Sequence, residues 1–304
     1  MRLIRNEEVQ AVAGTLDLGR ALEAAFAAAG AGKTALQPRE RISVDGVKLS
    51  TMAAILPAAG VAGAKIYTTI DGRFSFLVVL FDSETGKPLA CIEADSVTAL
   101  RTAAVTEIVA AALGPASPEN LAVFGTGTQG RAHIAALARR FPLSEIRLVS
   151  RGDAAGFCED MTATTGVPVR QVASRAAVDG AGIVVTATRA TEPVFDGNAL
   201  APGAFVAAVG STLPHAREID GRTFARATTV IVEDMEQSFR EAGGLILAEK
   251  DGDLDRSKVM TLGEAMADPR RARKTDDAII VFESVGIALE DVAVAAEIFR
   301  ALEV

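Results

Sequence analysis

Aromatic, sulfur and imidazole side chains are scarce in this sequence. Its 304 residues include no tryptophan, one tyrosine, two cysteines and two histidines. So few aromatic rings leave little material for a platform that stacks nucleic-acid bases. Cys91 and Cys158 stand in separate segments, and His133 and His215 are the only imidazoles, so we expect neither a disulfide bridge nor a bound metal.

Long apolar runs and basic clusters are lacking as well. No uncharged apolar stretch reaches the roughly 18 residues that a membrane span needs, and the first residues lack an apolar leader core. The net charge of −8 argues against a nucleic-acid surface. Because 49% of the residues are hydrophobic, the chain can bury a sizeable core. We therefore predict a soluble cytoplasmic protein that has neither a membrane nor a nucleic acid as partner.

The first third of the chain predicts an α+β domain with a largely antiparallel sheet. Residues 17–30 have a helical pattern that begins after a capping residue, Asp17. Residues 41–93 consist of short β-rich runs separated by turn residues, which indicates hairpins. The turn residues are Asp45-Gly46, Asp71-Gly72 and the Ser83–Gly86 stretch. Residues 95–115 predict a second helix.

The remainder of the chain has a different pattern. From residue 119 onward, strand-like runs alternate with helix-like runs, which is typical of βαβ units around a parallel sheet. The last segment, residues 283–304, predicts a long amphipathic helix. The fold class is therefore α/β, with a Rossmann-like NAD(P)-binding domain over residues 116–282. Residues 1–115 are expected to form an antiparallel α+β domain, to which the C-terminal helix returns.

A glycine-rich loop begins the Rossmann-like part. In the segment VFGTGTQGRAH, three glycines have the spacing G-x-G-x-x-G between a strand-like and a helix-like run. Such glycines permit a tight turn, close approach of a pyrophosphate and close helix packing, and the helix N-terminus attracts the phosphates. A plain strand-to-helix turn without a ligand is the alternative. The predicted cofactor-binding residues of this loop are Gly125, Gly127, Thr128, Gln129 and Gly130.

The end of the next strand favours one dinucleotide over the other. NAD-binding chains place an acid there to hold the ribose 2′-hydroxyl, whereas this chain has Ser150 and Arg151 and no acid before Asp153. A guanidinium and a hydroxyl bind a 2′-phosphate, which a carboxylate would repel. We therefore predict NADPH, with NADH as the alternative if Arg151 points into solvent.

Two cations stand among small or apolar residues. Arg101 shares the apolar face of the 95–115 helix, where an uncompensated charge would be expensive. It binds either a substrate carboxylate or an internal acid, for which Glu93 and Asp95 are candidates. Lys65 lies in a strand pattern and points either into a cleft or outward from a sheet edge.

Taken together, these segments resemble the ornithine cyclodeaminase/mu-crystallin family over nearly the whole chain. The resemblance rests on QPRERI, AGAKIYT, ADSVTALRTAAVTEIVA, VFGTGTQGRAH, AVGSTLPHAREID and VFESVGIALEDVAVA. It implies a dimerising substrate domain beside a Rossmann domain, and hence a homodimer. It also implies that Arg39, Lys65 and Arg101 bind the carboxylate of an amino or imino acid, with Lys65 and Arg101 as catalytic candidates. Arg41 is a weaker candidate than Arg39.

The resemblance further implies a nicotinamide neighbourhood and two departures from the founding enzyme. The nicotinamide neighbours would be Thr188, Val209, Gly210 and Ser284. Where ornithine cyclodeaminase has an aspartate for the terminal amine of its substrate, this chain has Thr212. Where that enzyme has a glutamate, the matching residue of this chain is Ser50. Thr212 is therefore a predicted substrate contact. The hydroxyls of Thr212 and Ser50 favour a substrate with an uncharged side chain over one that carries an ammonium group.

The resulting prediction is an enzyme of amino-acid metabolism, namely a ketimine reductase. It would use NAD(P)H to reduce 1-pyrroline-2-carboxylate or 1-piperideine-2-carboxylate to L-proline or L-pipecolate. The first alternative is an ornithine cyclodeaminase or an NAD-dependent amino-acid dehydrogenase of the same family. The second alternative is a non-catalytic, crystallin-like protein that binds NADPH.

Overall fold

The computed structural model describes residues 1–303. The chain forms two compact units. The first unit comprises Met1–Val105 and the C-terminal segment that starts at Gly286, and the second comprises Thr106–Val285. The chain passes from the first unit to the second inside helix α3 (Asp95–Leu113). The assignment of substrate to residues 1–115 and of cofactor to residues 116–282 stays a prediction.

The first unit is built on a six-stranded sheet with the order β1-β6-β5-β4-β3-β2. Neighbouring strands are antiparallel except β1, which pairs with β6 in parallel. The strands are β1 (Arg2–Ile4), β2 (Ala35–Val44), β3 (Val47–Leu56), β4 (Val61–Ile70), β5 (Arg73–Asp82) and β6 (Pro88–Glu93). The helices, besides the start of α3, are α1 (Asn6–Ala13), α2 (Leu18–Gly30), η1 (Pro57–Ala59) and α12 (Ala288–Glu303).

Two tight hairpins join the long strands of this sheet. Asp45 and Gly46 both have positive φ angles (46° and 80°), as have Asp71 and Gly72 (50° and 71°). A two-residue turn with both residues in this region matches the twist of the flanking strands. The predicted hairpins are thus confirmed. Strand β2 starts at Ala35, earlier than the β-rich runs predicted from residue 41, so the whole QPRERI segment lies within the strand.

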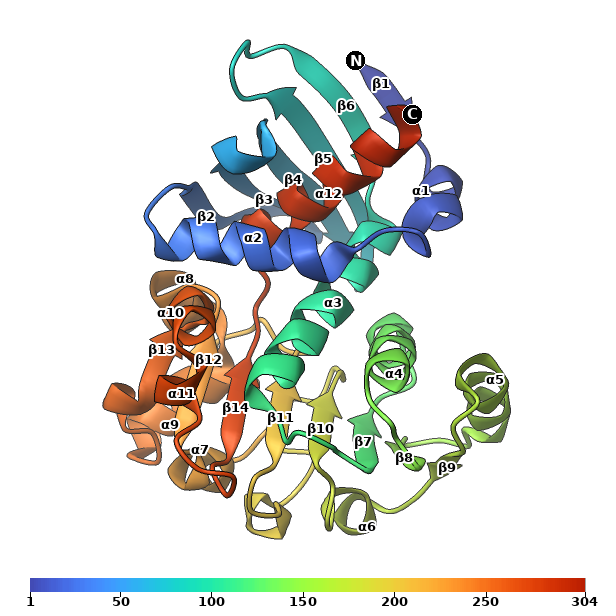
Figure 1. Cartoon of the computed structure of the whole chain (residues 1–304), viewed down its shortest axis with the longest axis vertical. Coiled ribbons are helices and arrows are strands. Elements are labelled where there is room, and N and C mark those ends of the chain that lie inside the picture. The colour runs from blue at the N-terminus through green and yellow to red at the C-terminus, as the bar shows by residue number, and fades with distance from the viewer. Residues whose placement is uncertain (304) are drawn as a thin grey trace. The chain divides into compact units, whose positions relative to one another are not determined.

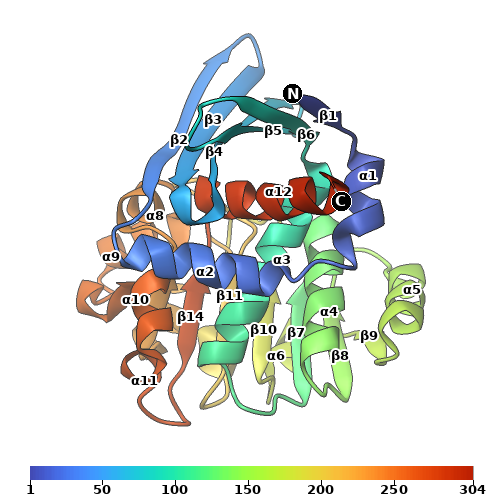
Figure 2. The same cartoon turned by 45° about the horizontal axis from the view of Figure 1, so that its top comes forward.

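Helix α12 runs along one face of the sheet, as Figures 1 and 2 show for the first unit. This face is called the inner face below. The helix packs on β3, β4 and β5 and on helix α2, and its residues from Ala288 to Ala296 are all buried. It begins later than the predicted start at residue 283. The residues before it, Ile280–Glu283, form a strand, and Gly286 has a φ of 69°, which a helix does not admit.

The second unit is built on an eight-stranded parallel sheet with the order β13-β12-β14-β11-β10-β7-β8-β9 (Figure 1). The strands are β7 (Asn120–Phe124), β8 (Glu145–Val149), β9 (Val169–Gln171), β10 (Ile183–Thr186), β11 (Phe205–Ala208), β12 (Thr229–Val232), β13 (Val259–Thr261) and β14 (Ile280–Glu283). The central strands are buried throughout, as expected for a parallel sheet covered on both faces. The predicted α/β fold class, with one Rossmann-like and one largely antiparallel unit, is confirmed.

Helices connect these strands. The α-helices are α4 (Thr128–Arg140), α5 (Ala155–Thr165), α6 (Ser174–Val178), α7 (Gly221–Arg226), α8 (Met235–Glu241), α9 (Gly243–Asp251), α10 (Leu262–Ala267) and α11 (Pro269–Ala272). The 3-10 turns are η2 (Gly197–Ala199) and η3 (Arg256–Lys258). In the part of the chain that the structure describes, one helix, α3, is long and apolar enough to cross a membrane. Its apolar window is 61% buried within the protein, and a core helix meets the same criteria.

Candidate functional site

Three predicted carboxylate-binding cations lie buried in the first unit. Lys65 is 2% exposed, Arg39 is 5% exposed and Arg101 is 6% exposed. Lys65 belongs to a central strand, where it stands opposite Met52 of β3 and Val78 of β5 on the inner face. The alternative of an outward-facing edge lysine is therefore wrong.

Two acids of helix α12 pair with these cations. Lys65 Nζ donates to Asp291 Oδ1 at 2.8 Å and to Thr98 Oγ1 at 2.8 Å. Arg101 Nη1 donates to Glu290 Oε2 at 2.5 Å, and Arg101 Nε lies 3.4 Å from Asp291 Oδ1. The four charged residues, Lys65, Arg101, Glu290 and Asp291, form a buried ionic network beside the start of α12.

Glu93, one of the two acids expected near Arg101, has other partners. Glu93 pairs with Arg5 at 3.0 Å and accepts the backbone N–H of Asn6. The internal ion pair of Arg101 that the sequence offered as an alternative exists, but Glu290 and Asp291 form it in place of Glu93, and Asp95 is exposed. Glu290 and Asp291 were missed. A charged pair within an otherwise apolar helical stretch, ALEDVAVA, is the sequence signal that could have revealed them.

The charges of this cluster do not cancel. Arg39, whose Nη2 donates to the carbonyl of Gly286 at 2.9 Å, brings the number of buried cations to three against two acids. Burial lowers the pKa of Lys65 to about 8, although the Asp291 carboxylate opposes this shift. Lys65 is thus largely protonated at neutral pH. The cluster carries one positive charge in excess, and a carboxylate anion would balance it.

Gly286 allows this cluster to form. A Cβ atom at this position would lie 2.3 Å from Arg101 Nη1, and the positive φ already disfavours other residues. The glycine therefore brings its carbonyl to Arg39 and leaves room for the Arg101 guanidinium.

An uncharged strip lies next to the cations on the same inner face. One step along the strands from Lys65, Ser50, Tyr67 and Phe76 stand opposite one another on β3, β4 and β5. The Tyr67 and Phe76 rings are 5.0 Å apart between centroids, and the parallel Phe74 ring is 5.4 Å from Phe76. Lys65 Nζ lies 4.6 Å from the Phe76 centroid. Ser50 Oγ is buried and has no hydrogen-bond partner in residues 1–303.

In the second unit, the glycine loop has the geometry that a dinucleotide requires. Gly125 has a φ of 111°, and a Cβ at Gly130 would lie 2.1 Å from the carbonyl oxygen of Gly125. Gly127 is the N-cap of α4, and no atom lies within 4 Å of the place where its Cβ would be. Open space therefore faces the helix N-terminus, where the N–H groups of Thr128, Gln129 and Gly130 precede the first intrahelical donor, Arg131. These features fit a pyrophosphate.

The predicted ribose contacts follow strand β8. Ser150 is half-buried and accepts a weak hydrogen bond from the Gly152 N–H at 3.4 Å. Arg151 is exposed, and the first acid beyond the strand is Asp153. The structure thus places a cation and a hydroxyl, but no acid, directly after the strand that an NAD-binding chain ends with an acid.

The predicted nicotinamide neighbours come together at one edge of the second sheet. Thr188 follows β10, Val209 and Gly210 follow β11, and Ser284 follows β14, which are consecutive strands in the sheet order. The carboxyl ends of parallel strands are where ligands bind in open α/β sheets. Thr212 follows in the loop after β11 and is half-buried.

Three buried acids at the same edge were missed by the sequence analysis. Glu218, Glu233 and Glu283 are between 2% and 6% exposed. Burial and the proximity of Glu218 and Glu233 raise the pKa of Glu283 well above its ordinary value. Their signal in the sequence was weak, because each acid adjoins ordinary strand or loop residues.

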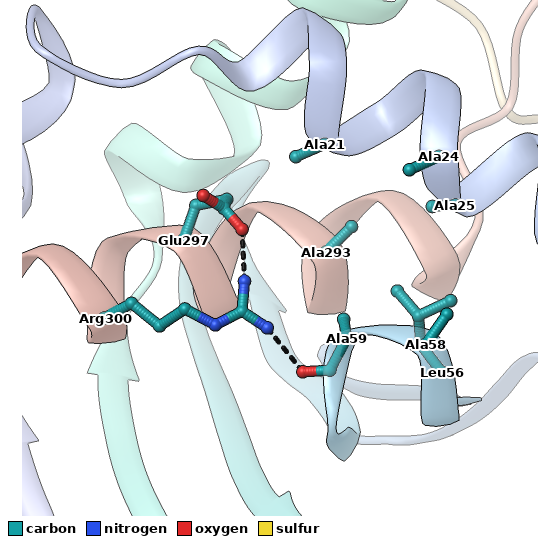
Figure 3. A pocket seen from close by; sticks show the side chains of 9 residues that line it. All are labelled: Ala21, Ala24, Ala25, Leu56, Ala58, Ala59, Ala293, Glu297 and Arg300. Carbon is teal, nitrogen blue, oxygen red and sulfur yellow. Dashed lines mark hydrogen bonds and ion pairs between the residues drawn. The ribbon is translucent and has the colours of Figure 1, made fainter.

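One small pocket of the first unit lies away from these residues. It is a cavity of about 130 Å³ between α2, η1 and α12, where Arg300 contacts Glu297 and the carbonyl of Ala59 (Figure 3). No predicted site residue lines it. Within residues 1–303, no group of three or more His, Cys, Asp or Glu side chains could hold a metal, and both cysteines are free thiols.

Solved structures of related chains share the entire fold. A probable ornithine cyclodeaminase from Bordetella pertussis Tohama I is 43% identical, with a TM-score of 0.96 over 99% of this chain and 97% of that one. Delta(1)-pyrroline-2-carboxylate reductase from Thermococcus litoralis, in complex with NADH and L-proline, is 26% identical with a TM-score of 0.93 over 100% and 98%. An archaeal alanine dehydrogenase dimer with bound NAD is 28% identical with a TM-score of 0.90 over 100% and 96%.

Sequence comparison agrees with these structures. The ketimine reductase mu-crystallin of Mus musculus is 32% identical over 81% of this chain and 78% of its own length. Relatives at about 30% identity are thus NAD(P)-dependent reductases and dehydrogenases, which supports an enzyme with this class of activity. The sequence profile of one family matches residues 2–303. The chain therefore belongs to the ornithine cyclodeaminase/mu-crystallin family.

Proposed function

We propose that this protein uses NADPH to reduce the C=N bond of an uncharged cyclic α-imino acid. The observation that carries the proposal is the buried cluster with one excess positive charge beside an uncharged aromatic strip. A carboxylate balances the cluster, and a flat ring packs on Tyr67 and Phe76 without burying a second charge. 1-Pyrroline-2-carboxylate and 1-piperideine-2-carboxylate combine these two features.

The residues have distinct roles in this proposal. Arg39, Lys65 and Arg101 bind the carboxylate and fix the orientation of the C=N bond, and positioning of this kind supplies much of the catalysis. Lys65 also holds a proton at Nζ that can pass to the imine nitrogen as the carbon is reduced, which its pKa of about 8 favours at neutral pH. NADPH, when bound to the glycine loop, supplies the hydride.

The relatives support this chemistry. The mouse relative is named a ketimine reductase, and the Thermococcus litoralis relative is a Delta(1)-pyrroline-2-carboxylate reductase whose structure holds NADH and L-proline. The reaction is tested by mixing the protein with NADPH and each cyclic imine and following nicotinamide absorbance. Absence of turnover with both imines would contradict the proposal and favour a crystallin-like binding protein.

A cyclodeaminase is the second candidate, because the 43% identical Bordetella pertussis chain is described as a probable ornithine cyclodeaminase. Against it stand Thr212 and Ser50, which place hydroxyls where an ammonium group would need acids. An amino-acid dehydrogenase acting on alanine, as in the archaeal relative, would leave the aromatic strip unoccupied. Ammonia release from L-ornithine and NAD⁺ reduction with L-alanine distinguish these activities.

Arg151→Asp is expected to reverse the preference for NADPH over NADH. One charge-assisted hydrogen bond to the 2′-phosphate contributes about 1.5–3 kcal/mol, so NADPH affinity should fall roughly 10- to 150-fold, while the new carboxylate accepts the 2′-hydroxyl of NADH. Fluorescence titration of both dinucleotides measures this. Equal affinities in the wild-type protein would contradict the prediction.

Gly127→Ala provides the matched control for this variant. The added methyl meets no atom of the protein, and φ is −76° at this residue, so the melting temperature should stay unchanged. The methyl does occupy the space for the pyrophosphate, so both dinucleotides should bind more weakly, without a change in their ratio.

The outer face of the first sheet suits a second copy of the chain. Seven large apolar side chains that point away from α12 are at least 39% exposed. They are Ile42, Val44, Val47, Ile55, Ile70, Leu77 and Phe81. An apolar area of this extent marks an interaction surface, and the archaeal alanine dehydrogenase is a dimer. The proposed partner is therefore an identical subunit.

Ile55→Asp is expected to convert a dimer into a monomer, because it buries a charge at this interface. Sedimentation should give twice the chain mass of 31.5 kDa for the wild type and 31.5 kDa for the variant. Leu213→Asp, at an exposed apolar residue of the second unit, should leave the mass at the dimer value. A monomeric wild type would refute the proposal.

The location of the protein in the cytoplasm stays a prediction.

A further inference from the structure

Glu218 bonds to two strand ends at once. Its Oε1 accepts the N–H and the hydroxyl of Thr188, at 2.6 and 2.7 Å, beyond the end of β10. Its Oε2 accepts the N–H of Gly210, at 2.6 Å, beyond β11, and the hydroxyl of Thr186, at 3.1 Å. The side chain is 2% exposed, so these four donors replace the water that a carboxylate would otherwise bind.

A second buried acid, at the end of one strand, bonds to the end of the neighbouring strand. Glu233, directly after β12, accepts the hydroxyl of Ser284 at 2.5 Å and the N–H of Val285 at 3.3 Å, beyond β14. Four consecutive strands of the sheet, β12-β14-β11-β10, are thus linked in pairs by carboxylates at their carboxyl ends. Three of the linked residues, Thr188, Gly210 and Ser284, are predicted nicotinamide neighbours.

The space around Gly210 is too small for a side chain. A Cβ there would lie 2.3 Å from the carbonyl oxygen of Thr188 and 2.6 Å from Glu218 Oε1. The two loops therefore approach each other as closely as a glycine allows, and the carboxylate fixes that separation.

We propose that Glu218 is a positioning residue that fixes the β10 and β11 loops as the support for the nicotinamide ring. This inference rests on the proposed function, because it takes Thr188 and Gly210 as neighbours of that ring. Glu218 itself touches neither substrate nor cofactor in this proposal. It sets the place of the reacting carbon, where small displacements reduce the rate strongly.

Glu218→Gln tests the proposal. Glutamine has the same shape but one carbonyl oxygen, so its NH₂ group would face either the Thr188 or the Gly210 N–H, and one loop would be released. We expect kcat to fall about tenfold or more, with a larger primary deuterium isotope effect from 4-deuterated NADPH. The NADPH dissociation constant should change less than kcat, because the phosphates are expected to bind at the glycine loop and the N-terminus of α4.

Two further variants serve as comparisons. Asp220→Asn breaks a similar clamp, because Asp220 accepts the N–H groups of Gly197 and Thr223 and the Thr223 hydroxyl, but it joins η2 to α7. It should lower the melting temperature and leave kcat and the isotope effect unchanged. Thr186→Val, which removes one of the four bonds to Glu218, should shift both quantities in the same direction as Glu218→Gln, and it remains testable if that variant fails to fold.

The outcomes are distinct. Wild-type kcat and isotope effect in Glu218→Gln, with a lower melting temperature, would assign the residue a purely structural role and overturn the inference. If no imine is reduced by the wild type, the proposed function fails. The fluorescence emission of bound NADPH then still measures how firmly the nicotinamide ring is held. Released loops should then weaken the emission of the bound nicotinamide in Glu218→Gln but not in Asp220→Asn, and equal emission would overturn the inference.

Discussion

Lys65→Met and Arg101→Met are expected to abolish most turnover while leaving NADPH binding intact. Removing one partner of a buried charge pair typically costs about 2–5 kcal/mol, which corresponds to a loss of kcat/KM of roughly 30- to several-thousand-fold. Both residues belong to the first unit, whereas the glycine loop belongs to the second. Steady-state kinetics and dinucleotide titration, performed on each variant, measure the two effects separately.

Arg5→Met is the matched control for these variants. Arg5 is an exposed cation of the same unit that pairs with Glu93, and exposed pairs contribute only about 0–1 kcal/mol. Its kcat/KM should equal that of the wild type. Loss of NADPH binding in Lys65→Met or Arg101→Met would mean that these residues maintain structure or hold the cofactor, and would contradict the carboxylate role.

The same lysine gives this prediction a pH dependence. The pKa of Lys65 is about 8, below its usual value, because of burial, so the ammonium is present below this pH and lost above it. Affinity for a planar ring carboxylate that does not itself titrate, such as pyrrole-2-carboxylate, should therefore fall as the pH rises through about 8. Lys65→Met should remove this inflection. Arg39, Arg101, Glu290 and Asp291 face the same cluster, and, against the effect of burial, the nearby Lys65 ammonium and the two guanidinium groups hold the pKa of Asp291 below its usual value.

L-Ornithine is expected to release no ammonia with NAD⁺, whereas cyclic imines are reduced with NADPH. The side-chain ammonium of ornithine would enter a strip formed by Ser50, Tyr67 and Phe76, which offers no carboxylate. Burying an uncompensated charge there is expensive, but an uncharged ring meets no such penalty. Ammonia release at rates usual for enzymes, around 1 s⁻¹ or more, would support the cyclodeaminase instead.

Thr212→Asp extends this comparison. The family resemblance implies that Thr212 contacts the substrate, so an added carboxylate should impair imine reduction, because an uncharged ring cannot balance the anion. Thr212→Asn, which has nearly the same size without the charge, should retain more activity. Equal activities in the two variants would show that Thr212 does not contact the ring.

Periodicity was sufficient for the fold class and for the larger elements. The two hairpin turns and the strand that carries Lys65 followed from local patterns of turn residues and alternation. Strands β9 and β13 were missed because three residues give no period to detect. Strand β14 was not predicted, and its last residue, Glu283, was assigned to the following helix, because the sequence is apolar on either side of Gly286.

The candidate site was predictable only in part. The cations could be identified because a charge on an apolar face needs a partner. The acids that pair with them could not be identified from the sequence, because Asp291 lies 226 residues from Lys65 and Glu290 lies 189 residues from Arg101. The sequence analysis treated an internal acid and a substrate carboxylate as alternatives for Arg101. They do not exclude each other, because the internal acids are present and the buried cations still outnumber them by one. Glu218 was missed because its four donors come from loops whose proximity only the fold creates.

The position of α12 also determines the order in which the first unit can be completed during synthesis. The three buried cations of the first unit leave the ribosome early. Glu290 and Asp291 follow only after the 180 residues of the second unit, from 106 to 285. At about 5–20 residues per second, this interval lasts roughly 10–35 s. The nascent sheet lacks both its counter-ions and its covering helix throughout that time, while the second unit is contiguous and depends on no later segment. The ribosome thus delivers a complete second unit before the first can close.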